Sequence, residues 1–164
     1  MRATAEAVLA LCRARGWKLA SAESCTGGLV GARLTDPAGA SDVYVGGVVA
    51  YSDDVKRTQL GVADETLNEH GAVSAETARG MAAGARRALG ADVALAVTGV
   101  AGPGGGSEEK PVGLVYLAAQ SPDGEFAERV QLEGDRQAIR ELATDQALLL
   151  LQKLLKQSAT NTSA

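Results

Sequence analysis

Apolar and polar residues follow two different periods along the chain, and each period predicts one type of secondary structure. Between residues 3 and 15, apolar residues recur at the spacing of one helical face: Ala5, Val8, Leu9 and Cys12. A later helix is predicted to begin after Ser74, whose hydroxyl suits an N-cap, with Glu76 in its first turn. In all, the pattern predicts helices at residues 3–15, 29–34, 53–62, 64–69, 75–89 and about 134–156.

Shorter apolar runs predict the strands. They lie at residues 17–22, 43–51, 91–100, 113–120 and 125–134. The run 91–100 is almost uninterrupted, which is typical of a central strand buried on both faces. The last two runs flank the turn-rich segment SPDG and predict an antiparallel hairpin. Because helices alternate with strands before this hairpin, we predict a three-layer α/β/α sandwich with a mixed sheet.

Length and composition limit the classes of protein to consider. The 164 residues suit one domain, predicted over 1–157 and followed by a polar tail at 158–164. The net charge of −4 gives no basic surplus, so no direct nucleic-acid partner is expected. Two separated cysteines and one histidine provide neither a disulfide framework nor a zinc site. Without a signal peptide or a membrane-spanning run, we expect a cytoplasmic protein with no membrane partner.

The stretch LASAESCTGGL, residues 19–29, gathers candidate nucleophiles at a predicted strand-to-helix turn. A helix N-terminus presents free N–H groups that suit a phosphate or carboxylate, and glycines allow close approach of a ligand. The residues that would serve such a ligand are Ser24, Thr26, Gly27 and Gly28. Cys25 is a candidate nucleophile, because a helix N-terminus lowers the pKa of a thiol. A capped helix without any ligand is the alternative.

A second glycine-rich segment, residues 97–113, follows the predicted central strand and contains Thr98 and Gly99. It lies at the edge where open α/β sheets usually bind ligands. Its spacing matches neither the P-loop nor the dinucleotide-binding fingerprint. The alternative is a flexible surface loop, but the length of the segment favours a functional role.

Two further groups of residues carry chemistry. Tyr51 and Lys56 flank a predicted strand-to-helix junction, and Ser41 precedes the same strand. Serine chemistry activated by lysine requires a partly desolvated lysine that is neutral for part of the time, whereas most lysines are solvated. Arg136 and Arg140 lie four residues apart and share a helical face, which suits a phosphate or a carboxylate. The alternative is a solvated face paired with neighbouring glutamates.

Taken in order, these motifs resemble a known family. The segments SAESCTGG, YSDDVKRTQLGV, GAVSAETARGMAAGAR, AVTGVAGPGGG with PVGLVYLA, and GDRQAIR resemble the C-terminal domain of the competence/damage-inducible protein CinA. That domain also occurs alone, as the bacterial nicotinamide mononucleotide deamidases (PncC). The resemblance covers about residues 4–156 and implies an amidohydrolase that converts nicotinamide mononucleotide and water to nicotinate mononucleotide and ammonia, in the recycling of pyridine nucleotides.

The resemblance also implies roles for individual residues. The family is described as serine–lysine hydrolases, which makes Ser41 the expected nucleophile and Lys56 the general base, with Tyr51 assisting. No metal or other cofactor is implied. The expected substrate-binding residues are Ser24, Thr26, Gly27, Gly28, Thr98, Gly99, Arg136 and Arg140. The motif does not distinguish between its two arginines, and Cys25 remains the rival nucleophile.

Two other functions compete with this enzyme. The first is a non-catalytic nucleotide-binding or regulatory module linked to competence or DNA damage, against which the intact set of Ser41, Tyr51 and Lys56 argues. The second is a DNA-binding competence factor, which the acidic composition disfavours. Apart from the small-molecule substrate, a second copy of the chain is a candidate partner, and the sequence leaves the oligomeric state open. The small residues of Gly80–Ala85 suit a subunit interface and core packing equally well.

Overall fold

Five strands form a single mixed sheet in the computed structural model, which describes residues 2–161. Their order across the sheet is β2-β1-β3-β4-β5. The strands are β1 (Leu19–Glu23), β2 (Tyr44–Val49), β3 (Val93–Gly99), β4 (Leu114–Ser121) and β5 (Gly124–Gln131). β1 pairs in parallel with both β2 and β3, whereas β4 runs antiparallel to β3 and to β5. The predicted mixed sheet, the central position of β3 and the late hairpin are therefore confirmed.

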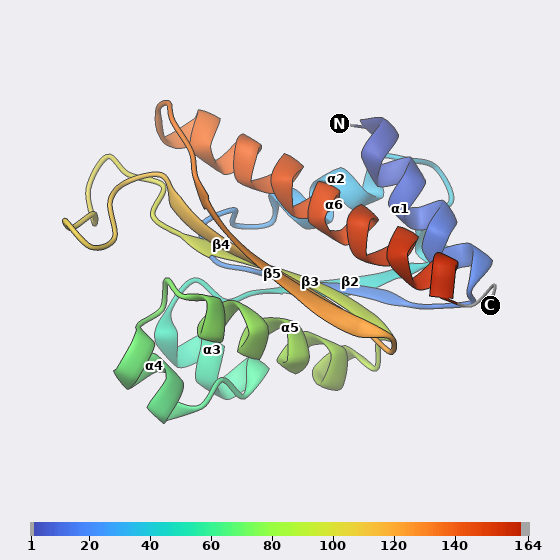
Figure 1. The fold of residues 1–164 in the computed structure, drawn as a ribbon, viewed down its shortest axis with the longest axis horizontal. Coiled ribbons are helices and arrows are strands. Elements are labelled where there is room, and N and C mark those ends of the chain that lie inside the picture. The colour runs from blue at the N-terminus through green and yellow to red at the C-terminus, as the bar shows by residue number, and fades with distance from the viewer. Residues whose placement is uncertain (1, 162–164) are drawn as a thin grey trace.

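Helices cover both faces of the sheet (Figure 1). One layer contains α1 (Arg2–Ala14), α2 (Leu29–Thr35) and α6 (Arg136–Asn161). The opposite layer contains α3 (Asp53–Leu60), α4 (Asp64–His70) and α5 (Ala75–Leu89). A single 3₁₀ turn, η1 (Ala40–Asp42), precedes β2. The predicted three-layer α/β/α sandwich is confirmed.

The two faces of the sheet differ in the size of their side chains. Because side chains alternate along a strand, Leu95 of β3 faces the α1–α2–α6 layer, whereas Ala94 and Ala96 face the α5 layer. Helix α5 contributes small buried residues of its own to this face, including Ala82 and Ala85. Small residues on both sides let α5 pack closely on the sheet, and Gly84 of α5 lets the end of α3 pack against it at Leu60.

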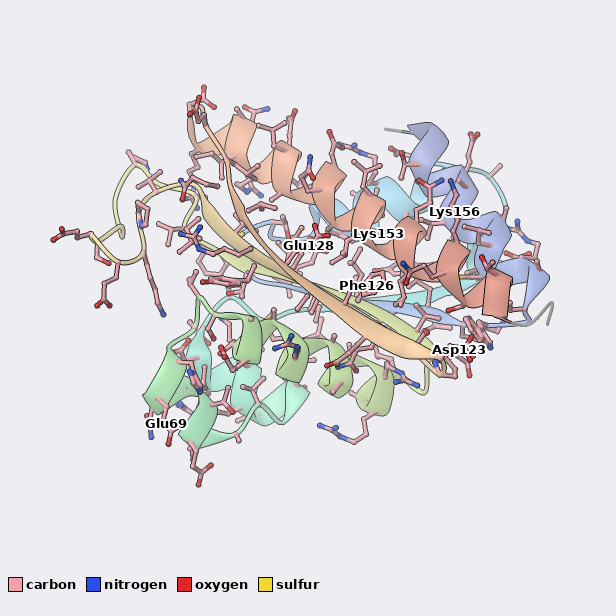
Figure 2. The ribbon with its side chains drawn as sticks, in the orientation of Figure 1. Glu69, Asp123, Phe126, Glu128, Lys153 and Lys156 are labelled. Atoms are coloured by element: carbon pink, nitrogen blue, oxygen red, sulfur yellow. The ribbon has the colours of Figure 1, made fainter. Side chains whose placement is uncertain are left out.

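Helix α6 also packs against the outermost strand β5. Figure 2 shows Lys153 of this helix beside Phe126 and Glu128 of the strand. The Lys153 Nζ lies 5.3 Å from the centre of the Phe126 ring and 3.4 Å from Glu128 Oε1. These contacts attach α6 to the charged, exposed edge of the sheet.

The last helix is longer than the sequence pattern predicts. Residues 158–161, expected in a polar tail, continue α6, and residues 162–164 lie outside the described part of the chain. The buried Ser158 donates its hydroxyl proton to Leu154 O at 3.2 Å, one turn earlier. This bond satisfies the buried hydroxyl within the helix.

Two glycines of α5 provide a matched test of how this helix packs against α3 and the residues that follow it. A Cβ at Gly84 would overlap the backbone carbonyl group of Leu60, whereas a Cβ at Gly80 would make ordinary contact with Val62 at 3.5 Å. We expect Gly84→Ala to lower the free energy of unfolding by about 1–3 kcal/mol, because α3 must move away. We expect Gly80→Ala to raise it by about 0.5–1 kcal/mol, because alanine favours the helix. Urea denaturation measures both, and equal effects at the two positions would contradict this packing.

Candidate active site

A cavity of about 230 Å³ opens at the carboxyl-terminal ends of β1, β2 and β3. It lies where open α/β sheets usually bind ligands. The residues that line it come from the turn after β1, the start of α3, the segment before α5, the end of β3 and the start of α6. They are Ser24, Cys25, Tyr51, Asp53, Lys56, Ala72, Val73, Thr98, Gly99, Ala101 and Arg136.

Lys56 is the most unusual residue of the cavity wall, because only 1% of its surface is exposed. Ser52 caps α3 by accepting a hydrogen bond from Val55 N at 3.2 Å, and the helix then carries Lys56 inward. The Lys56 Nζ donates to Ala50 O at 2.9 Å and to Ser24 Oγ at 3.2 Å. Its charged neighbour is Asp53, whose Oδ1 lies 3.8 Å from Lys56 Nζ.

Burial sets the protonation of this amine. Removal of the ammonium from water lowers the pKa of Lys56, and the nearby Asp53 carboxylate opposes the shift. A lowered pKa increases the fraction of neutral amine near neutral pH. A neutral amine 3.2 Å from the Ser24 hydroxyl can accept its proton, which is the arrangement that activates a serine nucleophile. Lys56 is therefore a desolvated lysine with a lowered pKa, as serine chemistry activated by lysine requires.

The expected pairing of Ser41 with Lys56 must be corrected. Ser41 is exposed in η1, which precedes β2, whereas Lys56 follows β2 at the other end of the strand. Six residues of extended chain span about 20 Å, so the two side chains lie beyond opposite ends of β2. The hydroxyl that contacts Lys56 is that of Ser24. The predicted strand already separated Ser41 from Lys56, but only the parallel pairing of β1 with β2 shows that Ser24 is the serine beside Lys56.

The N-terminus of α2 is also used differently than predicted. The buried carboxylate of Glu23 accepts hydrogen bonds from the N–H groups of Gly28, Val30 and Gly31, at 3.1, 2.9 and 3.1 Å. A side chain of the protein thus occupies the place expected for an anionic ligand. Thr26, Gly27 and Gly28 do not line the cavity. Their role in the structure is to form the turn that presents Ser24, with Gly27 and Gly28 at φ of 58° and 110°.

The two arginines of α6 have separate roles, which the sequence could not distinguish. Arg140 donates to Cys25 O and Thr26 O, both at 3.1 Å, and does not line the cavity. It therefore holds the turn rather than a ligand. Arg136 lines the cavity, where its guanidinium donates to Gly102 O at 2.7 Å and to the Tyr51 hydroxyl at 2.9 Å.

Three other predicted residues lie at the cavity. Tyr51 is 61% exposed and stands at its mouth beside Arg136. Thr98 is buried, and its hydroxyl donates to Ala72 O at 2.7 Å, which ties the end of β3 to the segment before α5. Gly99 contributes to the wall next to it. The structure thus brings together Ser24, Lys56, Tyr51, Thr98, Gly99 and Arg136.

Cys25 borders the cavity, yet its sulfur belongs to the core. The residue is only 5% exposed, and burial raises the pKa of its thiol to about 11. The backbone N–H of Cys25, Arg140 and Lys56 oppose this shift without cancelling it. A thiol with such a pKa is almost entirely protonated at neutral pH and is therefore a poor nucleophile.

Two contributors to the site were missed by the sequence analysis. Asp53 lines the cavity beside Lys56, and Glu23 caps α2 from within the fold. Asp53 resembles an ordinary helix N-terminal acid in sequence, so no local signal separates it from Asp54. Glu23 offered a signal that could have been used, because an acid just before a glycine turn is placed to cap the following helix.

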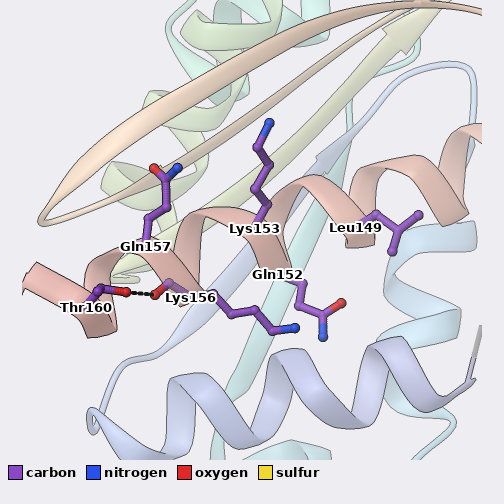
Figure 3. A pocket seen from close by; sticks show the side chains of 6 residues that line it. All are labelled: Leu149, Gln152, Lys153, Lys156, Gln157 and Thr160. Atoms are coloured by element: carbon purple, nitrogen blue, oxygen red, sulfur yellow. Dashed lines mark hydrogen bonds between the residues drawn. The ribbon is translucent and has the colours of Figure 1, made fainter.

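A separate hollow of about 360 Å³ lies along α6 (Figure 3). Its lining residues are Leu149, Gln152, Lys153, Lys156, Gln157 and Thr160. None of them pairs a nucleophile with a base, so the cavity around Ser24 is the better candidate for catalysis. Within residues 2–161, no three histidine, cysteine or acidic side chains gather as metal ligands would. None of the described helices is both long and apolar enough to cross a bilayer.

Comparison with known proteins points to one family. The family model described as the CinA C-terminal domain matches residues 1–155. A CinA-like protein of Syntrophobacter fumaroxidans is 50% identical over 143 residues, which are 87% of this chain and 34% of that protein. The chain therefore spans about a third of the length of the curated relatives it matches.

Solved structures agree in fold. The competence/damage inducible protein CihA from Agrobacterium tumefaciens superimposes with a TM-score of 0.90 and 43% identity, covering 94% of each chain. A CinA superfamily protein from Klebsiella pneumoniae gives a TM-score of 0.90 and 37% identity, covering 95% of this chain and 98% of that one.

The cap formed by Glu23 can be tested through stability. Glu23→Gln places an NH₂ group against backbone N–H donors, so a buried donor loses its acceptor. We expect the free energy of unfolding to fall by about 1–3 kcal/mol. The matched control is Glu65→Gln in the first turn of α4, where the side chain is exposed and the change should stay within about 0.5 kcal/mol. Equal urea midpoints for Glu23→Gln and the unmodified protein would contradict the cap.

Proposed function

The chain belongs to the CinA C-terminal domain family, and we propose that it is an amidohydrolase that converts nicotinamide mononucleotide and water to nicotinate mononucleotide and ammonia. The observation that carries the proposal is the contact between the Ser24 hydroxyl and the buried amine of Lys56 in a cavity. The sequence resemblance to nicotinamide mononucleotide deamidases supplies the substrate. In this proposal Ser24, rather than Ser41, is the nucleophile.

The first half of the reaction forms an acyl-enzyme. Neutral Lys56 accepts the hydroxyl proton of Ser24 while Ser24 Oγ attacks the carboxamide carbon. The carbonyl oxygen of the substrate becomes an oxyanion. The N–H of Cys25, the residue after the nucleophile at this turn, is the proposed donor to that oxyanion. A donor in this position is worth about 10²–10³ in rate.

The second half returns the enzyme to its starting state. The Lys56 ammonium gives its proton to the amide nitrogen, the C–N bond breaks, and ammonia leaves. Water then attacks the ester carbon of the acyl-enzyme while Lys56 accepts one of the water protons. Collapse of the second tetrahedral intermediate breaks the bond to Ser24 Oγ, which recovers its proton, and releases nicotinate mononucleotide.

The phosphate of the substrate is assigned to Arg136. A guanidinium carries five N–H donors, and Arg136 uses two of its nitrogens on Gly102 O and the Tyr51 hydroxyl. These bonds fix the orientation of the side chain at the cavity wall and leave further donors for a phosphate. The Tyr51 hydroxyl lies beside the Arg136 guanidinium in the cavity, so in this proposal Tyr51 assists by helping to bind the phosphate. Arg140 takes no part in binding.

The identity of the nucleophile is tested by three variants. We expect Ser24→Ala and Lys56→Met each to reduce ammonia release from nicotinamide mononucleotide by at least about 10³-fold, because each removes one half of the reacting pair. Ser41→Ala is the control and should keep the rate, because Ser41 lies at the opposite edge of the sheet. The assay measures ammonia without added metal. Loss of activity in Ser41→Ala with retention in Ser24→Ala would overturn the assignment.

The rival nucleophile is tested separately. We expect Cys25→Ala to keep ammonia release within a few-fold of the unmodified protein, because its thiol stays protonated at neutral pH. Preincubation with iodoacetamide under native conditions should leave the rate unchanged for the same reason. A loss of activity that alkylation and Cys25→Ala share, with the fold intact by circular dichroism, would instead favour the thiol.

A further inference from the structure

We propose that Asp53 selects substrates whose reacting carboxamide is attached to a positively charged pyridinium ring. The inference rests on the proposed function, because it places the reacting carbon at Ser24. It adds a basis for specificity: N-glycosylated pyridinium amides are favoured over neutral amides of similar shape. Three observations support it, namely the position of Asp53, its distance from the nucleophile and the distribution of charge in the cavity.

Asp53 is a carboxylate of the cavity wall that stays open to solvent. It belongs to the first turn of α3, and 53% of its side chain is exposed although it lines the cavity. Its Oδ1 lies 3.8 Å from Lys56 Nζ, beyond hydrogen-bond distance. The carboxylate is therefore accessible to a ligand in the cavity.

The distance from Asp53 to the nucleophile matches the size of the substrate. Lys56 Nζ lies 3.2 Å from Ser24 Oγ and 3.8 Å from Asp53 Oδ1, so these two oxygens are at most about 7 Å apart. A carboxamide carbon poised for attack lies about 3–3.5 Å from the serine oxygen. The ring is bonded directly to that carbon. A ring that points from this carbon toward the start of α3 therefore lies beside the Asp53 carboxylate, and this is the orientation we propose.

The charges of the cavity match those of the mononucleotide. Its ring is cationic and its phosphate is anionic, while the cavity offers Asp53 and Arg136 as groups of opposite sign. The groups that face Lys56 are the Asp53 carboxylate from α3, the carbonyls of Ala50 and Tyr51, and Ser24 and Cys25 of the turn after β1.

When Lys56 is neutral and ready to act as a base, Asp53 has lost its cationic neighbour. A pyridinium ring then supplies the missing positive charge. Because that ring also repels an ammonium, it favours the neutral form of Lys56 that catalysis needs. A neutral amide provides neither effect.

Paired ligands test this selection through binding. The inactive Ser24→Ala protein is titrated calorimetrically with nicotinamide mononucleotide and with its reduced dihydropyridine form, which has the same ribose phosphate but an uncharged ring. We expect the further change Asp53→Asn to weaken binding of the oxidised ligand about fivefold and to leave binding of the reduced ligand unchanged. The same change at Asp54, which faces Arg57 at 3.7 Å outside the cavity, is the control and should affect neither.

A pH profile of ammonia release gives a second readout that a purely structural role would not change. Asp53 raises the pKa of Lys56, so Asp53→Asn should lower that pKa. Because the base must be neutral, the rising limb of kcat against pH is expected to move to lower pH. The Asp54→Asn protein should keep the original limb.

The outcomes separate this inference from the proposed function. If the unmodified protein releases no ammonia from nicotinamide mononucleotide, the proposed function itself fails. If it does, equal weakening of both ligands by Asp53→Asn would show contact with the ribose instead, and would overturn the selection of charge. Unchanged binding of the oxidised ligand would overturn it as well.

Discussion

The burial of one lysine amine against one serine hydroxyl is the constraint on which the site depends. An ammonium removed from water is costly, and few folds keep one with only 1% of the residue exposed. Here Lys56 reaches the Ala50 carbonyl and the Ser24 hydroxyl, and its pKa is lowered by the same burial. The burial that packs the Lys56 side chain into the fold is therefore also the cause of its lowered pKa.

The turn that carries Ser24 is held by ionic groups that do not enter the cavity. Glu23 binds the N–H groups at the start of α2, and Arg140 binds the carbonyls of Cys25 and Thr26 from α6. These groups act from the two flanks of one short turn. Together with the bend at Gly27 and Gly28, these bonds fix the position of Ser24 at the cavity wall. The polar residues of this stretch are thus divided between Ser24, which lines the cavity, and Glu23, which supports the turn.

The two layers of the sandwich divide their tasks as well. On the α1–α2–α6 side, larger side chains such as Leu95 fill the main core, and α6 extends Arg136 and Arg140 toward the sheet edge. On the other side, alanines pack α5 on the sheet, and Gly84 lets α3, which carries Lys56 and Asp53, pack against α5. The cavity forms where residues of both layers meet at the carboxyl-terminal ends of β1, β2 and β3. Its opposite charges at Arg136 and Asp53 come from different layers, which only a complete sandwich can bring together.

Local patterns of the sequence determined most of the fold. Apolar periodicity, caps such as Ser74 and the hairpin turn place the helices and strands close to their observed positions, because each depends on residues that are neighbours in the chain. The same patterns found Lys56 and the SAESCTGG turn, whereas the pairing of Lys56 with Ser41 came from the family resemblance. Only the tertiary structure decided that Ser24 is its partner. Because β1 and β2 are parallel, Ser24 and Lys56, which follow them, lie at the same ends of the strands. Ser41 precedes β2 and lies at the opposite end. The order of residues along the chain already separates Ser41 from Lys56, because they flank the same strand. It does not show that β1 and β2 are parallel neighbours, and it is this pairing that brings Ser24 to Lys56.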